Sequence, residues 1–212
     1  MVGVGAVAGI AVVALGLVLT PGPNMFYLVS RSLTQGRRAG LVSLAGVAAG
    51  FLVYAAAASA GIAAVFTLVP SLYTAVQVAG AAYLLWLAWQ AVRPGGVSVF
   101  APAEVPEHGP GRLFAMGLVT NLLNPKIAVL YVSLLPQFVD PAQGAVAVQS
   151  LVLSVVQIVV AVSVNALIVV TAGSVSSLLS RRPGWLRVQR YFMGTVLAGL
   201  AVQLLTSRAR PA

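Results

Sequence analysis

The chain contains no cysteine and very little acid: its 212 residues include 12 lysines and arginines but only three aspartates and glutamates and one histidine. Without cysteine there is no disulfide framework and no thiol chemistry. With so few acids and a single histidine, neither a His/carboxylate metal site nor an ordinary nucleophile–base pair can be assembled in the apolar part of the chain. We therefore expect no enzyme active site, no metal and no cofactor.

Hydrophobic residues make up 60% of the chain and charged residues only 7%. This is more apolar surface than a soluble domain of this size can bury. A bilayer accepts it, because roughly 20 apolar residues in a helix cross the hydrocarbon core while satisfying their own backbone. Six transmembrane helices are predicted, at about 5–29, 40–66, 72–92, 113–138, 146–172 and 190–207. The expected fold is an all-α polytopic membrane protein in a lipid bilayer.

The basic residues predict how these spans are oriented. Nine of the twelve lie in alternate loops: Arg31, Arg37, Arg38, Arg93, Arg112, Arg181, Arg182, Arg187 and Arg190. The opposite loops carry none, and only Arg208 and Arg210 at the C-terminus join that side. Because short basic loops stay in the cytoplasm, we expect both termini to be extracytoplasmic. This alternation also argues against nucleic-acid binding, for which bases gather on one face.

Two similar halves are predicted on either side of a Pro-rich stretch: a first three-helix repeat at 1–92, a cytoplasmic linker at 93–112 and a second three-helix repeat at 113–212. Pro23 in the first span corresponds to Pro125 in the fourth, and each follows a helix-weakening residue. Three spans per half insert the halves in opposite senses. This predicts an inverted 3+3 repeat with broken first and fourth helices and binding at the repeat interface.

The predicted breaks carry the polar residues of the spans. A proline removes a backbone donor and clashes with the preceding turn, and the freed groups must face protein or a water-filled cavity. Lys126, directly after Pro125, is the only charged side chain well inside a predicted span, which makes it a candidate site residue. The alternatives are that the prolines only kink the packing, and that Lys126 reaches an interface or holds carbonyls freed by Pro125.

Several motifs together resemble one known family. They are Thr20-Pro21-Gly22-Pro23-Asn24, Gln35-Gly36-Arg37-Arg38-Ala39-Gly40, Gly46 with Gly50, Asn121-Leu122-Leu123-Asn124-Pro125-Lys126, and Leu135-Pro136-Gln137-Phe138. In this order the chain resembles, over essentially its whole length, the lysine exporter/homoserine–threonine resistance (LysE/RhtB) family of bacterial amino-acid exporters. The resemblance implies a six-helix exporter of small amino acids across the bacterial inner membrane, driven by the proton-motive force.

An amino acid is a zwitterion, so its site must replace water around a carboxylate and an ammonium. Lys126 and the amides of a broken helix end suit the carboxylate, while freed carbonyls and asparagine side chains suit the ammonium. The predicted substrate-binding residues are Pro21, Gly22, Pro23, Asn24, Asn121, Asn124, Pro125 and Lys126. With no acid inside the spans, neutral substrates such as threonine or homoserine are favoured.

Three further expectations concern polar residues, a coupling residue and helix packing, and one alternative function is kept. Gln157 and Asn165, with Gln149, recur every eight residues on one face of the fifth span, where they line the pathway or form interhelical hydrogen bonds. Asp140 is a candidate coupling residue, with capping of the turn before Pro141 as the alternative. The small residues Gly46 and Gly50 suit close helix packing, within one chain or across a homodimer. A channel-like or structural membrane subunit is the rival function, because broken helices also line pores.

Overall fold

The computed structural model describes residues 2–62, 70–93, 106–179 and 183–206, and all of their regular structure is helical. The α-helices are α1 (Val4–Leu19), α2 (Pro23–Gln35), α3 (Arg37–Ala57), α5 (Pro70–Val92), α6 (Pro110–Leu122), α7 (Pro125–Val129), α8 (Val146–Leu179) and α9 (Pro183–Thr206). Shorter turns are the π-helical η1 (Ala58–Ile62) and η2 (Leu130–Leu134) and the 3₁₀ segments η3 (Leu135–Phe138) and η4 (Pro141–Gln143).

By length and composition, two helical segments are able to cross a membrane, Arg37–Gly61 and Val146–Ser174. The number rises to four if each of two bent helix pairs is one span. This is fewer than the six predicted spans, although α5 and α9 occupy the third and sixth predicted segments. The chain is thus a multi-pass helical membrane protein. Residues 63–66 and 207 of the predicted spans, linker residues 94–105, and Arg181, Arg182, Arg208 and Arg210 lie outside the described residues.

Both predicted helix breaks are present. The first pair, α1 and α2, bends by 55°, and the second, α6 and α7–η3, bends by 50°. In each case a proline begins the second helix, at Pro23 and at Pro125, where its missing N–H costs nothing. Asn124 caps the second break by accepting a hydrogen bond from the Lys126 amide at 3.1 Å. The first broken segment is longer than predicted, because α2 continues to Gln35.

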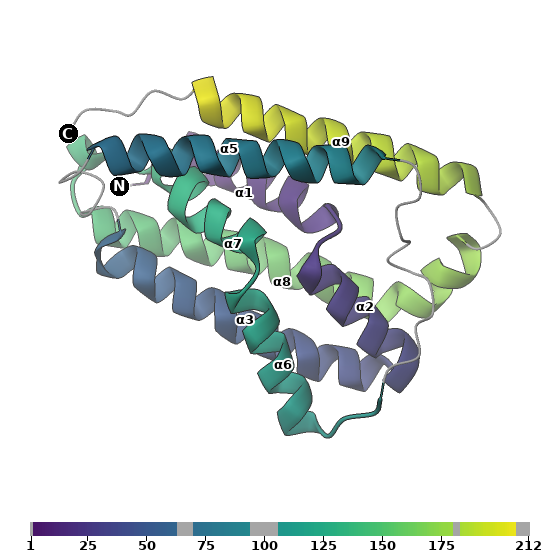
Figure 1. Ribbon diagram of the computed structural model, residues 1–212. Helices are drawn as coiled ribbons and strands as arrows, with labels where there is room; N and C mark the ends of the chain where they lie inside the picture. The colour runs from purple at the N-terminus through teal and green to yellow at the C-terminus, as the bar shows by residue number, and fades with distance from the viewer. Residues whose placement is uncertain (1, 63–69, 94–105, 180–182, 207–212) are drawn as a thin grey trace.

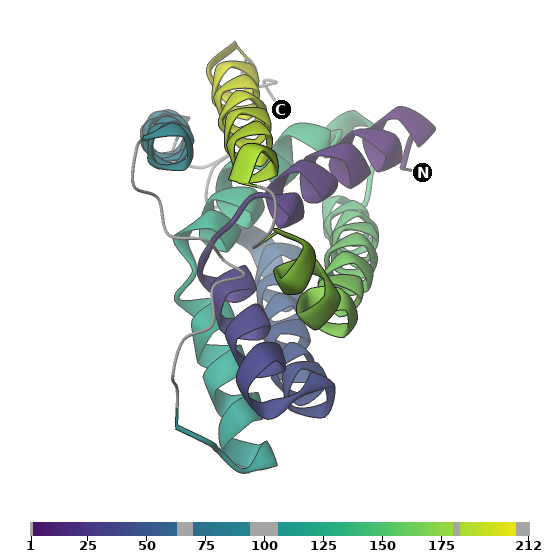
Figure 2. The same ribbon diagram turned by 90° about the vertical axis from the view of Figure 1, so that its right-hand side faces the viewer.

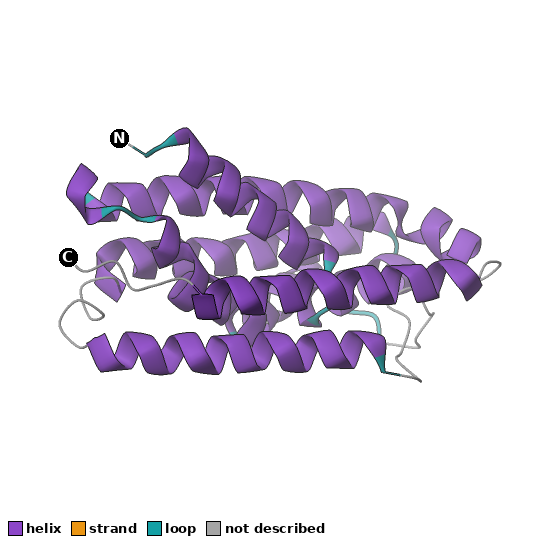
Figure 3. Ribbon diagram, turned by 90° about the horizontal axis from the view of Figure 1, so that it is seen from above, coloured by secondary structure: helices purple, strands orange, loops and turns teal. Residues whose placement is uncertain are grey.

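The helices form a central group with one flanking pair. α5 and α9 run side by side along the upper edge of Figure 1 and are seen nearly end-on at the top of Figure 2. At their contact, a Cβ added to Gly194 would lie 2.5 Å from a Val92 methyl. The central group holds α1, α2, α3, α6, α7 and α8. Seen from above, most of the helical segments run roughly left to right (Figure 3).

Glycines allow α3 and α6 to cross at close range. A Cβ at Gly46 would overlap the carbonyl oxygen of Phe114, and one at Gly117 would overlap that of Ser43. A Cβ at Gly50 would lie 2.7 Å from the Asn121 side chain. The small residues at Gly46 and Gly50 therefore serve packing within one chain; the homodimer stays a prediction.

Apolar side chains fill the interior and also cover the outside. The interior includes Ile10, Leu28, Leu84, Leu153 and Leu197, all fully buried. The outer surface carries exposed Val12, Leu52, Trp89, Leu167 and Val202. A soluble domain would seldom show so much apolar surface, and a lipid-facing surface accounts for it.

Polar side chains along α2 fasten it to its neighbours. Tyr27 donates to the Leu113 carbonyl at 2.7 Å, and Ser32 donates to the Val169 carbonyl at 2.6 Å. Arg31 donates to the Pro106 carbonyl at 2.7 Å and lies over the Tyr27 ring. Arg31, predicted as a loop residue, is therefore a buried residue of α2.

Candidate functional site

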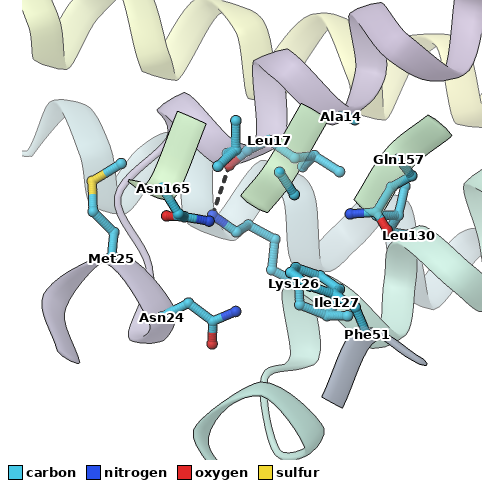
Figure 4. Close-up of a pocket in the computed structure, with 12 residues that line it drawn as sticks. Ala14, Leu17, Asn24, Met25, Phe51, Lys126, Ile127, Leu130, Gln157 and Asn165 are labelled. Atoms are coloured by element: carbon cyan, nitrogen blue, oxygen red, sulfur yellow. Dashed lines mark hydrogen bonds between the residues drawn. The ribbon is translucent and has the colours of Figure 1, made fainter. Parts of the chain in front are cut away.

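A small cavity lies where the two broken segments meet (Figure 4). Its lining residues are Ala14, Leu17, Val18, Asn24, Met25, Phe51, Lys126, Ile127, Leu130, Gln157, Ala161 and Asn165. They come from α1, α2, α3, α7, η2 and α8. The cavity volume is about 20 Å³, which is enough for a water molecule or two and too little for an amino acid.

Lys126 is only 5% exposed, and its ammonium reaches across to the first broken segment. Nζ donates to the carbonyl oxygens of Leu17 and Thr20, both at 2.8 Å. These carbonyls lie at the end of α1, where the break leaves them without the usual α-helical donors. Lys126, which follows the second break, thus binds carbonyls of the first break and not the carbonyls freed by Pro125.

Gly22 makes room for this ammonium. A Cβ at Gly22 would lie 3.0 Å from Lys126 Nζ and 3.3 Å from its Cε. The backbone of Gly22 is extended, with φ −171° and ψ 178°, a conformation open to other residues. Glycine is therefore needed here for space and not for its backbone freedom.

The start of α2 brings two further features to the cavity. The helix begins at Pro23 without a side-chain cap, so its first amides are free and carry the positive end of the helix dipole. Asn24 lines the cavity, is 6% exposed, and its Oδ1 has no hydrogen-bond partner in the described structure. A buried acceptor without a donor is costly, which suits a group that a substrate completes.

The remaining predicted binding residues lie apart from the cavity lining. Asn121 is fully buried at the α3–α6 contact, and neither of its amide atoms has a partner among the described residues. Asn124 caps α7 with its oxygen, while its Nδ2 likewise lacks a partner. The prolines Pro21, Pro23 and Pro125 do not line the cavity either. The structure brings together Asn24 and Lys126, with Gly22 against Lys126, and the prolines act through the backbone.

One face of α8 completes the cavity. Gln157, Ala161 and Asn165 are spaced by four residues, so they stack along the same side of the helix. Gln157 accepts a hydrogen bond from the Tyr131 hydroxyl at 2.7 Å. Gln149 has a different task, since its Nε2 donates to the Asp140 carbonyl at 2.8 Å and it does not line the cavity.

Asp140 lies in the turn that contains η4, away from the cavity lining. Its Oδ1 accepts from the Ala142 amide at 3.1 Å, and its Oδ2 accepts from Gln143 Nε2 at 3.0 Å. Both carboxylate oxygens therefore stabilise their own turn, the arrangement expected of a capping residue.

Sequence reasoning did not single out Phe51 or Tyr131. Phe51 lines the cavity from α3 and is 2% exposed. Tyr131 is fully buried in the π-helical turn η2, and its ring stacks on Tyr54 with centroids 5.2 Å apart. A weak signal was available, because Tyr131 adds a hydroxyl to an otherwise apolar run after Lys126. Nothing in the sequence distinguishes Phe51 from the other large side chains of its span.

The site has the groups for binding a charged small molecule and lacks those of a metal site. Among the described residues that line the cavity, Lys126 is the only charged one. Across the described ranges, no cluster of three or more histidine, cysteine, aspartate or glutamate residues is placed to hold a metal ion.

Comparison with known proteins agrees with the helical membrane architecture. The chain is 29% identical to a threonine efflux protein of Escherichia coli (strain K12) over 206 residues, which cover 94% of this chain and 97% of that protein. It is 26% identical to a leucine efflux protein of Klebsiella pneumoniae over 200 residues, or 91% of each chain. No solved structure matches. The family of LysE type translocators matches residues 15–208, and the chain belongs to this family of membrane transporters, which are not enzymes.

Proposed function

We propose that this protein is a secondary transporter that exports small neutral amino acids, of the threonine or homoserine type, from the cytoplasm. Relatives named for threonine and leucine efflux support an amino acid as the substrate. The lining supports a neutral one, because the described part of it carries one charged residue, Lys126. A cationic side chain would meet no acid there, and an anionic one would compete with the substrate's own carboxylate for a single lysine.

The observation that carries the proposal is that two backbone carbonyls already bind an ammonium. Lys126 Nζ occupies the oxygens of Leu17 and Thr20 at 2.8 Å each. We infer that the substrate binds by exchange, its ammonium replacing that of Lys126 on these carbonyls while its carboxylate pairs with the displaced lysine. No buried ion is left unpaired after the exchange, which matters because each unpaired ion costs several kcal/mol.

Neighbouring groups support both ends of the substrate. The unpartnered Oδ1 of Asn24 is a further acceptor for the substrate ammonium. The free amides at the start of α2 are donors for its carboxylate, favoured by the helix dipole. Asn165 and Gln157 on α8 extend the polar lining along the proposed pathway. Asn121 and Asn124 lie outside the lining, and we propose that they act by holding the second break in shape.

The proposed architecture is six spans in an inverted 3+3 repeat, at 1–92 and 113–212, joined by a linker at 93–112. The matched bends of 55° and 50° at the start of each half support it. The cavity also supports it, because its lining residues come from the first and second predicted spans of each half. Inverted repeats with broken helices bind substrate at the interface of the halves and expose it to either side in turn.

Substrate entry requires a wider state, because the cavity measures about 20 Å³. We propose that α2 pivots at the break between α1 and α2 to open the cytoplasmic side. This helix is fastened to its neighbours by separate hydrogen bonds, from Tyr27 to Leu113, Ser32 to Val169 and Arg31 to Pro106. Individual hydrogen bonds of about 0.5–1.5 kcal/mol net each are readily exchanged in such a movement.

The proposed energy source and membrane are those that the family resemblance implies, and the proposed orientation comes from the basic loops. We propose the bacterial inner membrane from the family resemblance, and extracytoplasmic termini from the bias of basic loops. We also propose that the proton-motive force drives export. For Asp140 to take part in coupling, its turn would have to open, since both of its carboxylate oxygens accept hydrogen bonds there.

Transport by purified protein in proteoliposomes tests the proposal. A panel of labelled amino acids is presented with and without an imposed pH gradient. We expect saturable transport of a small neutral amino acid that is accumulated against its own gradient only when the pH gradient is present. Flux that does not saturate would instead identify a channel-like protein, and the absence of any flux a structural membrane subunit.

A further inference from the structure

The side-chain amide of Gln157 is held in one orientation, and its NH₂ group makes no hydrogen bond to the described residues. Its side chain is 2% exposed, and its Oε1 accepts the Tyr131 hydroxyl at 2.7 Å. This bond orients the amide, so that its NH₂ group points away from Tyr131. Within the described structure no protein group accepts from Nε2, although Gln157 lines the cavity. Figure 4 shows the nitrogen of Gln157 directed toward the side of Lys126.

The two polar residues that α8 contributes to the lining lie toward opposite ends of the cavity. Gln157 and Asn165 are eight residues apart, or about 12 Å along the helix. In Figure 4, Asn165 and Asn24 are drawn on the side of the Lys126 ammonium, whereas Gln157 and Leu130 are drawn on the opposite side of Lys126. An amino acid whose charged groups bind at the Lys126 end therefore directs its side chain toward Gln157.

We propose that Gln157 determines specificity by donating a hydrogen bond from Nε2 to a hydroxyl on the substrate side chain. Hydroxylated amino acids are thereby selected over aliphatic ones of the same shape. Tyr131 is a positioning residue, which acts by fixing the Gln157 amide. This inference rests on the proposed export of neutral amino acids and adds the group that discriminates among them.

The chemistry of the cavity favours this discrimination. A neutral amide recognises a hydroxyl without requiring a charge on the substrate side chain. Phe51 and Leu130 provide apolar contacts for the remaining carbon atoms. An aliphatic substrate would leave the Nε2 donor buried and unpaired, and a site that hydrogen-bonds a substrate hydroxyl rejects analogues lacking it for this reason.

Threonine and valine test the inference, because they have nearly the same shape and differ by one hydroxyl. Transport of both is measured in proteoliposomes, and the ratio of their transport efficiencies is independent of how much protein is active. We expect the wild-type protein to prefer threonine by about 10-fold or more. Gln157→Leu should reduce the ratio about 10-fold, by a loss on threonine and a gain on valine.

Variants of Tyr131 and of the α8 surface sharpen this test. Tyr131→Phe keeps the ring but removes the hydroxyl that orients Gln157, so the ratio should fall, and it should fall no further when Gln157→Leu is added. Ser163→Ala, on the exposed side of α8, should leave the ratio unchanged. If Gln157→Leu does not reach the membrane, Gln157→Asn withdraws the amide by one methylene and should lower the ratio likewise.

The outcomes separate the inference from the proposed function. A wild-type protein that transports neither threonine, valine nor any other amino acid overturns the proposed function. A wild-type protein that transports both equally, or a ratio that is unchanged in Gln157→Leu or Gln157→Asn, overturns the role of Gln157 and leaves amino-acid export in place.

Discussion

Replacing Gly22 by alanine tests the binding role of Lys126, because it displaces the lysine without removing it. The added methyl group would lie 3.0 Å from Nζ and 3.3 Å from Cε, so the flexible end of the lysine must shift by a few tenths of an ångström. The extended backbone of Gly22 accepts alanine without strain. Gly22→Ala therefore acts on the ammonium, and Lys126→Ala provides the complete loss for comparison.

The expected magnitudes follow from the contacts of Lys126. Its two charge-assisted hydrogen bonds, to Leu17 and Thr20 at 2.8 Å, are worth about 1.5–3 kcal/mol each. If the ammonium pairs with the substrate carboxylate, Lys126→Ala removes a buried charge partner and costs about 3–5 kcal/mol, hundreds-fold or more in affinity. A shifted ammonium in Gly22→Ala should cost about 1 kcal/mol, or roughly five-fold.

Binding of labelled threonine to purified, folded protein is measured together with thermal unfolding. We expect both variants to bind threonine more weakly than the wild type, and Lys126→Ala more weakly than Gly22→Ala. The thermal stability of Gly22→Ala should stay close to that of the wild type. Gly173→Ala is the matched control, because a Cβ at this α8 glycine meets nothing within 4 Å. Near-normal affinity in folded Lys126→Ala would remove Lys126 from the binding site and leave it as a clamp between the two breaks.

Five other variants give four further predictions. Lys126→Arg should restore binding poorly in the same assay, because its planar group is larger and differently directed than an ammonium and the cavity holds about 20 Å³. Pro23→Ala should abolish export while leaving membrane insertion intact, since a restored amide favours a continuous helix; normal export would show that the break is only a packing kink. Gly46→Ala should lower thermal stability by about 1–3 kcal/mol through overlap with Phe114, and an unchanged melting temperature would contradict the close α3–α6 crossing. In the cysteine-free background, an impermeant thiol reagent added to intact cells should label Ala142→Cys and spare Arg38→Cys, both at exposed positions; the reverse pattern would invert the orientation.

The sequence determined the features that depend on neighbouring residues. Composition alone required a lipid environment. The prolines at Pro23 and Pro125 placed both breaks correctly, because a missing backbone donor and a steric clash are local properties of the chain. The same reasoning selected Lys126 as the charged residue inside a predicted span, and the structure shows it buried at 5% exposure. Sequence spacing also placed Gln157 and Asn165 on one face of a helix.

Tertiary structure decided which of these groups meet. Lys126 binds the carbonyl of Leu17, 109 residues away, and no local pattern specifies that contact. The eight-residue spacing could not separate Gln157, which lines the cavity, from Gln149, which holds the Asp140 turn. Asn121 shares a motif with Lys126 yet faces α3 at Gly50. The reason is physical: dihedral preferences are set within a few residues, whereas the partner of a buried polar group depends on how whole helices pack.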